Sequence, residues 1–238
     1  MTRTRWLALS LLFISLSASA QGQENLIRKN LSERVPQMPK IEEVTRTPMP
    51  GLFEVRLSNN EIYYSDAEGN FLISGNLIDT KNRRNLTEER EAKLNAIDFA
   101  SLPLKDAITV VRGNGKRKLA VFEDPNCGFC KRFERDLAKV DNITVYLFLY
   151  PVLGQNSVDK SRAIWCAKDP AATWHNVMVN DQNPPSASCN TAAIDRNLEL
   201  GRKYKITGTP TLIAQDGSRV PGAISTAQIE KLLADASK

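Results

Sequence analysis

The 238-residue sequence has only one histidine, His175, and only four cysteines. Cys127 and Cys130 are spaced C-x-x-C, but Cys166 and Cys189 do not form a second motif of that kind. A structural zinc site needs four ligands, usually supplied by two such pairs or by one pair and two histidines. The shortage of ligands argues against a metal site, and the sequence predicts no metal and no other cofactor.

The sequence also has no long run of basic residues and only one extended apolar run. The formal net charge is +5, but the lysines and arginines are not clustered, so we infer no nucleic-acid partner. The one apolar run, from Trp6 to Leu16, is roughly eleven residues long, which is too short for a membrane-spanning helix. We see no internal repeat and no low-complexity tract.

That apolar run belongs to a segment with the features of a secretory signal peptide. Arg3 and Arg5 precede it, and the small residues Ala18 to Ala20 follow it. We predict a cleaved signal peptide at residues 1–20, with a retained membrane anchor as the alternative. Removing both arginines lowers the net charge from +5 to +3. Export takes the chain away from cytosolic reductants, so its even number of cysteines is expected to pair.

After the leader, helical spacing over residues 23–35 predicts a short amphipathic helix, and from residue 41 to 80 the apolar positions follow a period of two. Phe53, Val55 and Leu57 share one face of a predicted strand, and turns are expected at 59–60 and 68–70. The result is a small antiparallel module over residues 21–84. A core of that size is marginal, so the strand edges are expected to find a partner.

Residues 85–101 predict a linker helix, with an ordinary surface helix of one continuous domain as the alternative. From 102 to 238 strands and helices alternate, which is typical of an α/β domain following an α+β module. We predict strands at 118–123, 143–150 and 211–214, and a helix from Cys127 to Lys139. The stretch 156–203 is helical with breaks at prolines, and Ser225 with Gln228 caps a final helix.

The sequence Cys127-Gly128-Phe129-Cys130 stands where a predicted strand ends and a helix begins. Unpaired N–H groups and the dipole at a helix N-terminus stabilise a thiolate. Cys127 is therefore predicted to be the exposed nucleophile, and Cys130, one turn further on, the resolving thiol. A purely structural disulfide is the alternative, but so short a loop constrains the unfolded chain little.

Thr209-Pro210 stands before the strand predicted at 211–214. Proline tolerates a cis peptide bond. Taken alone, however, a proline at a strand entrance is an ordinary edge proline.

With these motifs the chain resembles the bacterial periplasmic disulfide isomerases of the DsbC and DsbG type. The resemblance is carried by residues 50–55, the turn at 68–70, the active-site approach at 121–130 and Gly208-Thr209-Pro210. It implies an N-terminal dimerisation domain at 21–84, a linker helix at 85–101 and a thioredoxin-like catalytic domain with a helical insertion at 102–238. Gly128, Phe129, Thr209 and Pro210 would support the active site, with Pro210 in a cis-proline loop. Cys166 and Cys189 would form the family's non-catalytic disulfide.

The resemblance also implies a function. Members are homodimers whose dithiols face a shared apolar cleft for misfolded substrate. This chain would isomerise or reduce incorrect disulfides of secreted proteins in the periplasm, and a membrane electron donor of the DsbD type would keep it reduced. A dithiol oxidase and a holdase-type chaperone stay open as alternatives.

Two positions depart from what the resemblance leads one to expect. Phe129 replaces the tyrosine of the best-known family dipeptide, and Val121 occupies the position of thioredoxin's buried acid. Glu123 or Asp124 could instead take the proton of Cys130, or either could be a solvated or capping carboxylate.

Overall fold

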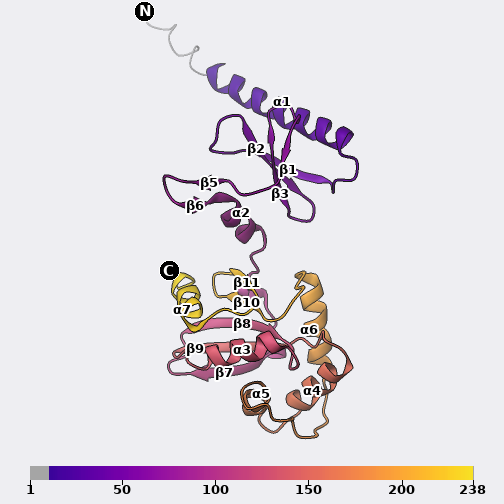
Figure 1. Cartoon of the computed structure of the whole chain (residues 1–238), viewed down its shortest axis with the longest axis vertical. Helices are drawn as coiled ribbons and strands as arrows, with labels where there is room; N and C mark the ends of the chain where they lie inside the picture. The colour runs from indigo at the N-terminus through magenta and orange to yellow at the C-terminus, as the bar shows by residue number, and fades with distance from the viewer. Residues whose placement is uncertain (1–10, 238) are drawn as a thin grey trace, which may run out of the picture. The chain divides into compact units, whose positions relative to one another are not determined.

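The computed structural model describes residues 11–237, which divide after Leu94 into two compact units (Figure 1). Residues 1–10 of the predicted signal peptide lie outside the described residues. Within the part of the chain that is described, no helix is long and apolar enough to cross a bilayer.

The first unit contains a long helix, a four-stranded antiparallel sheet and a short helix. Helix α1 (Leu11–Arg34) is followed by strands β1 (Ile41–Arg46), β2 (Leu52–Leu57), β3 (Ile62–Asp66) and β4 (Leu72–Ile73), which lie in that order in the sheet. Strands β5 (Ile78–Asp79) and β6 (Arg84–Asn85) form a separate antiparallel pair ahead of α2 (Leu86–Leu94).

The core of this unit lies between α1 and one face of the sheet. Phe53, Val55 and Leu57 are buried while the residues between them are half-buried, which confirms the predicted period of two along β2. Ile27 and Leu31, one helical turn apart on α1, pack against them. The helix predicted at 23–35 is therefore present, although it begins earlier in the chain.

Both predicted turns of this module are confirmed. Asn60 connects β2 to β3 with a φ of 69°, and Gly69 connects β3 to β4 with a φ of 68°. These angles lie in the left-handed region, which asparagine and glycine adopt more readily than other residues.

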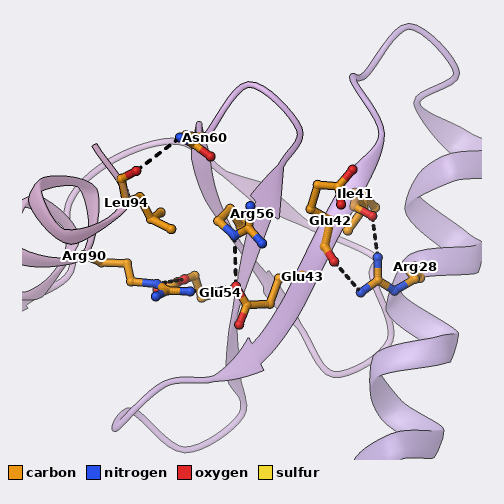
Figure 2. A network of polar contacts seen from close by, with 9 residues as sticks. All are labelled: Arg28, Ile41, Glu42, Glu43, Glu54, Arg56, Asn60, Arg90 and Leu94. Atoms are coloured by element: carbon orange, nitrogen blue, oxygen red, sulfur yellow. Dashed lines mark hydrogen bonds and ion pairs between the residues drawn. The ribbon is translucent and has the colours of Figure 1, made fainter. Parts of the chain in front are cut away.

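Helix α2 is shorter than predicted and is bound to the sheet of its own unit (Figure 2). Arg90 on α2 forms ion pairs with Glu54 at 3.0 Å and with Glu43 at 2.6 Å, and Glu43 also pairs with Arg56 at 2.9 Å. The hydrogen bond from Arg56 is the largest of the effects that lower the pKa of Glu43. A single linker helix reaching Ser101 was therefore a wrong prediction.

The helix ends early because the next apolar residues belong to the core of the second unit. Ile97 and Phe99 are both buried there, and the backbone N–H of Ile97 donates to the carbonyl of Gly217 at 2.9 Å. Asp98 then caps a short 3₁₀ helix, η1 (Phe99–Ser101), by accepting from the N–H of Ala100.

The second unit is built on a five-stranded sheet. Its strands are β7 (Ile108–Arg112), β8 (Arg117–Glu123), β9 (Ile143–Leu149), β10 (Thr211–Ala214) and β11 (Arg219–Pro221), arranged in the order β11-β10-β8-β9-β7. Strands β8 and β9 are parallel, and the other neighbours are antiparallel. The strands predicted around β8, β9 and β10 are confirmed, whereas β7 was not predicted.

Helices cover both faces of this sheet. Leu119 and Val121 of β8 face α3 (Gly128–Leu137) and α7 (Thr226–Asp235), and Figure 1 shows α3 in front of the sheet. Ala120 and Phe122 face the opposite side, where residues of α6 (Ala192–Lys203) pack. The predicted cap of the last helix is confirmed, because Ser225 and Gln228 form a reciprocal capping box.

A helical insertion follows β9. It contains α4 (Gln155–Trp165) and α5 (Pro170–Val179), and an irregular segment then leads to α6. Cys166, which caps the C-terminus of α4, forms a disulfide with Cys189 in that segment, with the two Cα atoms 5.4 Å apart. The bond closes the loop that contains α5.

Candidate active site

The C-x-x-C motif lies at the corner where β8 passes into α3. Cys127 is the N-cap residue of α3, and its Sγ accepts a hydrogen bond from the backbone N–H of Cys130 at 3.3 Å. The backbone N–H of Cys127 in turn donates to the carbonyl of Asp124 at 3.0 Å. The first thiol is thus fixed at the positive end of the helix dipole, where negative charge on sulfur is stabilised.

The two thiols differ in burial, though less than predicted. Cys127 is 6% exposed and Cys130 is fully buried, so the prediction of an exposed Cys127 was wrong. The cis-proline loop covers it, because the Cys127 thiol donates to the carbonyl of Thr209 at 3.3 Å. Burial raises the pKa of Cys130 well above that of a free thiol.

Thr209 and Pro210 reach the dithiol from a distant part of the chain. The peptide bond between them is cis, and Pro210 is buried at the entrance to β10. The backbone N–H of Gly222, the residue after β11, donates a hydrogen bond to the carbonyl of Pro210 at 2.7 Å and so holds the loop in place. Sheet order brings this loop to the motif, since β10 is the neighbour of β8.

The two residues between the cysteines lie on the surface. Phe129 is 65% exposed and has the guanidinium of Arg132 at 5.8 Å from its ring centre. Gly128 is also exposed, and a Cβ added to it would meet no atom within 4 Å. Packing within the protein therefore does not require glycine at 128 or phenylalanine at 129, and the exposed ring is available for contact with another molecule.

Asp124 is a structural hub beside the motif. Its buried carboxylate accepts four hydrogen bonds, from the backbone N–H groups of Asn126, Val152 and Leu153 and from the hydroxyl of Ser157, at 2.7–2.9 Å. The loop after β9 and the start of α4 are thereby bound to the active-site corner. Four accepted bonds are as many as the two oxygens of a carboxylate ordinarily take.

Glu123, the residue before Asp124, differs from it in its hydrogen bonding. It is fully buried, and among the described residues neither of its oxygens makes a well-aligned hydrogen bond. Burial raises its pKa well above the ordinary value, and the nearby carboxyl of Glu134 adds to the effect. The Cys130 thiol lies close enough to interact with it.

Sequence reasoning missed three residues of this neighbourhood. Val152 and Leu153 expose apolar side chains on the loop that Asp124 holds, and Glu134 points inward from α3. Glu134 had a detectable signal, because it lies four residues after Cys130 and therefore on the same face of the helix. The loop residues had none, since a short apolar pair between two elements is typical of many surface loops.

Neither the lone histidine nor any acidic cluster suggests a metal centre. His175 is exposed on α5, and among the residues that the structure describes no group of three or more histidine, cysteine, aspartate or glutamate side chains could hold a metal ion.

Comparison with protein families identifies both units. Residues 17–88 match the model of the disulfide bond isomerase N-terminal domain, and residues 104–237 match a thioredoxin-like domain. The two matches leave out the connection between the units.

Curated relatives are thiol:disulfide interchange proteins as well. The chain is 47% identical over 190 residues to the probable thiol:disulfide interchange protein DsbC of Bordetella pertussis, covering 80% of this chain and 67% of the relative. It is 27% identical to the thiol:disulfide interchange protein DsbC of Escherichia coli, covering 95% and 94%. Among solved structures, a disulfide interchange protein from Neisseria gonorrhoeae is 35% identical with a TM-score of 0.55, covering 58% of this chain and 99% of that one.

Proposed function

The chain belongs to the DsbC family of thiol:disulfide interchange proteins and is a disulfide isomerase or reductase, and we propose that Cys127 and Cys130 are its redox pair. The observation that supports this assignment is the place of Cys127, which caps α3 and lies against Thr209. That position stabilises a thiolate and borders a backbone carbonyl next to which an extended substrate segment can bind.

The proposed reaction begins when the Cys127 thiolate attacks a wrong disulfide of a secreted protein. One substrate sulfur forms a mixed disulfide with Cys127, and the other leaves as a thiolate. Either that thiolate attacks another disulfide of the substrate and finally frees the enzyme, or Cys130 attacks Cys127. The second route releases a reduced substrate and leaves the enzyme oxidised, so a membrane electron donor of the DsbD type must reduce it again.

Refolding of scrambled ribonuclease tests the assignment. Cys127→Ser should abolish the recovery of ribonuclease activity, because Cys127 is the one free cysteine of the described structure that caps a helix. Cys130→Ser is the matched control: it should still attack and should accumulate as a mixed disulfide. Recovery that persists in Cys127→Ser would show that the nucleophile is a different residue.

The substrate surface is proposed to be apolar. Phe129, Val152 and Leu153 are exposed, and Asp124 holds the loop that carries the last two at the active-site corner. Exposed apolar groups that gather near a reactive thiol fit the unfolded segments of a misfolded client. The same surface favours a second function, that of a holdase-type chaperone.

A pair of assays separates these roles. Leu153→Ser should weaken the suppression of aggregation of a cysteine-free client, while the reaction with a small disulfide stays unchanged. Thr173→Ser, on α5, changes a half-buried residue outside this surface and serves as the control. Undiminished suppression in Leu153→Ser would exclude the loop from client binding.

We also propose that the first unit forms a homodimer through β4. This strand is at one edge of the sheet, and Phe71, Leu72 and Ile73 are all exposed there. The opposite edge, β1, instead exposes the charged residues Glu42 and Arg46. An apolar edge invites pairing with another strand, whereas charges discourage it. A second copy of β4 would continue the sheet antiparallel.

Sedimentation of the full chain tests the dimer. Ile73→Lys should yield a monomer, because a lysine cannot be buried in a paired edge without a partner. Val111→Lys is the matched control, since Val111 lies on the edge strand β7 and is 61% exposed, compared with 50% for Ile73. A monomeric wild-type chain would instead favour the oxidase alternative.

Periplasmic localisation completes the proposal, with residues 1–20 as a cleaved signal peptide. The mass of the protein recovered from the periplasm should correspond to a chain that begins at Gln21. Alkylation after acid quenching reports the redox state of Cys127 and Cys130 in the cell. A predominantly reduced pair supports an isomerase or reductase, and a predominantly oxidised pair supports an oxidase.

A further inference from the structure

Glu123 has a position that the exchange reaction described so far does not use. It is the last residue of β8 and follows Leu119 and Val121 in the alternation that points toward α3. Its carboxyl group is fully buried and has no well-aligned hydrogen bond within the described residues. Because burying an unsatisfied carboxyl group costs stability, its presence at this point calls for a functional reason.

The groups that act on Glu123 are the two active-site thiols and a second acid. Cys127, Cys130 and Glu134 of α3 all lie close enough to interact with it. Burial, and after it the charge of Glu134, raises the pKa of Glu123 well above the ordinary value of a glutamate. Burial likewise raises the pKa of Cys130, and the charge of Glu123 contributes to that increase. Cys130 therefore needs help to lose its proton before it can attack.

Glu134 connects this buried group to the surface. One of its oxygens accepts a hydrogen bond from the indole N–H of Trp174 at 2.9 Å. Its side chain also lines a cavity of about 50 Å³ together with Arg112 of β7 and His175 of α5. A cavity needs roughly 10–15 Å³ to hold one water, so this one can hold several. The cavity is partly open, and His175 on its lining is exposed.

The charged and titratable groups around the cavity are few. Arg112 faces Glu134 from β7, and its Nε has no hydrogen-bond partner within the described residues. Burial lowers the pKa of Arg112, while the charges of Glu134 and Asp141 oppose that change. His175 borders the cavity from α5. These groups give a polar lining to a space that otherwise lies between apolar side chains.

Given the proposed role of Cys130 as the resolving thiol, we propose that Glu123, Glu134 and this cavity carry the Cys130 proton to solvent. The proton on the sulfur of Cys130 moves to an oxygen of the Glu123 carboxylate, and from there it passes through Glu134 to water. The Cys130 thiolate then forms a bond to the sulfur of Cys127, and the substrate thiolate leaves with the electrons of the broken bond. The protein sulfurs are oxidised and the substrate sulfur is reduced.

A chromogenic aromatic disulfide separates this step from the first one. Mixed in equal amount with the reduced full chain, it releases one aromatic thiolate when Cys127 attacks and a second when Cys130 attacks. Cys130→Ser should show only the first phase and so identifies the two. Glu199→Gln makes the same chemical change at an exposed position of α6 and is the control for the substitution.

Glu123→Gln should leave the first phase within about twofold of wild type and slow the second at least about a hundredfold at neutral pH, the lower end of what a positioned general base contributes. The slowed phase should recover as the pH rises, because hydroxide can then take the proton. Glu134→Gln should slow the second phase as well. A purely electrostatic role predicts the reverse, because removing Glu123 lowers the pKa of Cys130 and would speed the second phase.

An unchanged or faster second phase in Glu123→Gln overturns the proposal. Slowing in Glu123→Gln alone overturns the outward path through Glu134. A wild-type chain that shows no first phase contradicts the assignment of Cys127 instead, so the two failures can be told apart.

Discussion

The hydrogen-bond hub at Asp124 gives a prediction whose magnitude follows from the structure. Asp124→Ala removes a buried carboxylate that accepts from Asn126, Val152, Leu153 and Ser157. Each bond to a charged acceptor contributes about 1.5–3 kcal/mol, but water can reach some of the freed donors, because Val152 and Leu153 are exposed. We expect a loss of about 3–5 kcal/mol, the range observed when one partner is removed from a buried charged network.

Urea unfolding followed by tryptophan fluorescence measures this loss in the appropriate unit. Trp165 and Trp174 both lie in the second unit, so their emission reports its unfolding. Asp159→Ala is the matched control. Asp159 is exposed on α4 and accepts only from the side chain of Gln155 at 2.9 Å, so its loss should cost under about 0.5 kcal/mol.

Hydrogen exchange gives the local part of the same prediction. The backbone N–H groups of Val152 and Leu153 should be protected in the wild type and should exchange freely in Asp124→Ala, because their acceptor is gone. A stability change below about 1 kcal/mol, with both amides still protected, would refute the reasoning that Asp124 holds this loop.

Two further predictions concern stability away from the dithiol. Cys166→Ala, which removes the bond to Cys189, should lower the free energy of unfolding by about 3.5 kcal/mol on the loop-entropy model, since the cysteines are 23 residues apart; equal urea midpoints for variant and wild type would contradict it. Arg196→Gln should lower the free energy of unfolding at neutral pH, because Arg196 donates two hydrogen bonds to the buried Asp106. The Arg196 guanidinium holds the pKa of Asp106 below its ordinary 3.8, so the pair stabilises the folded chain at higher pH and loses its effect as the pH falls through the folded pKa. Urea titrations should therefore show the gap between variant and wild type narrowing below about pH 4, and a gap that widens in acid would be inconsistent with the pair.

Much of the architecture is local information and could be predicted from the sequence. Phe53, Val55 and Leu57 alternate along one strand, and Ser225 with Gln228 marks a helix start. Both are patterns within a few residues, set by the geometry of the backbone itself. The linker helix predicted at 85–101 was wrong, because helical composition continues past Leu94 while Ile97 packs in the core of the second unit.

The motif Cys127-Gly128-Phe129-Cys130 shows how far the sequence alone reaches. The sequence determined that Cys127 caps a helix and that Cys130 lies one turn further in, because four adjacent residues define that corner. Tertiary structure alone decided that Thr209 covers Cys127, that Cys166 bonds to Cys189, and that the buried Glu123 lies near Cys130. Each of these contacts depends on the order of the strands in the sheet or on how the helices pack over it. Neither the strand order nor the helix packing can be deduced from a periodic pattern in the sequence.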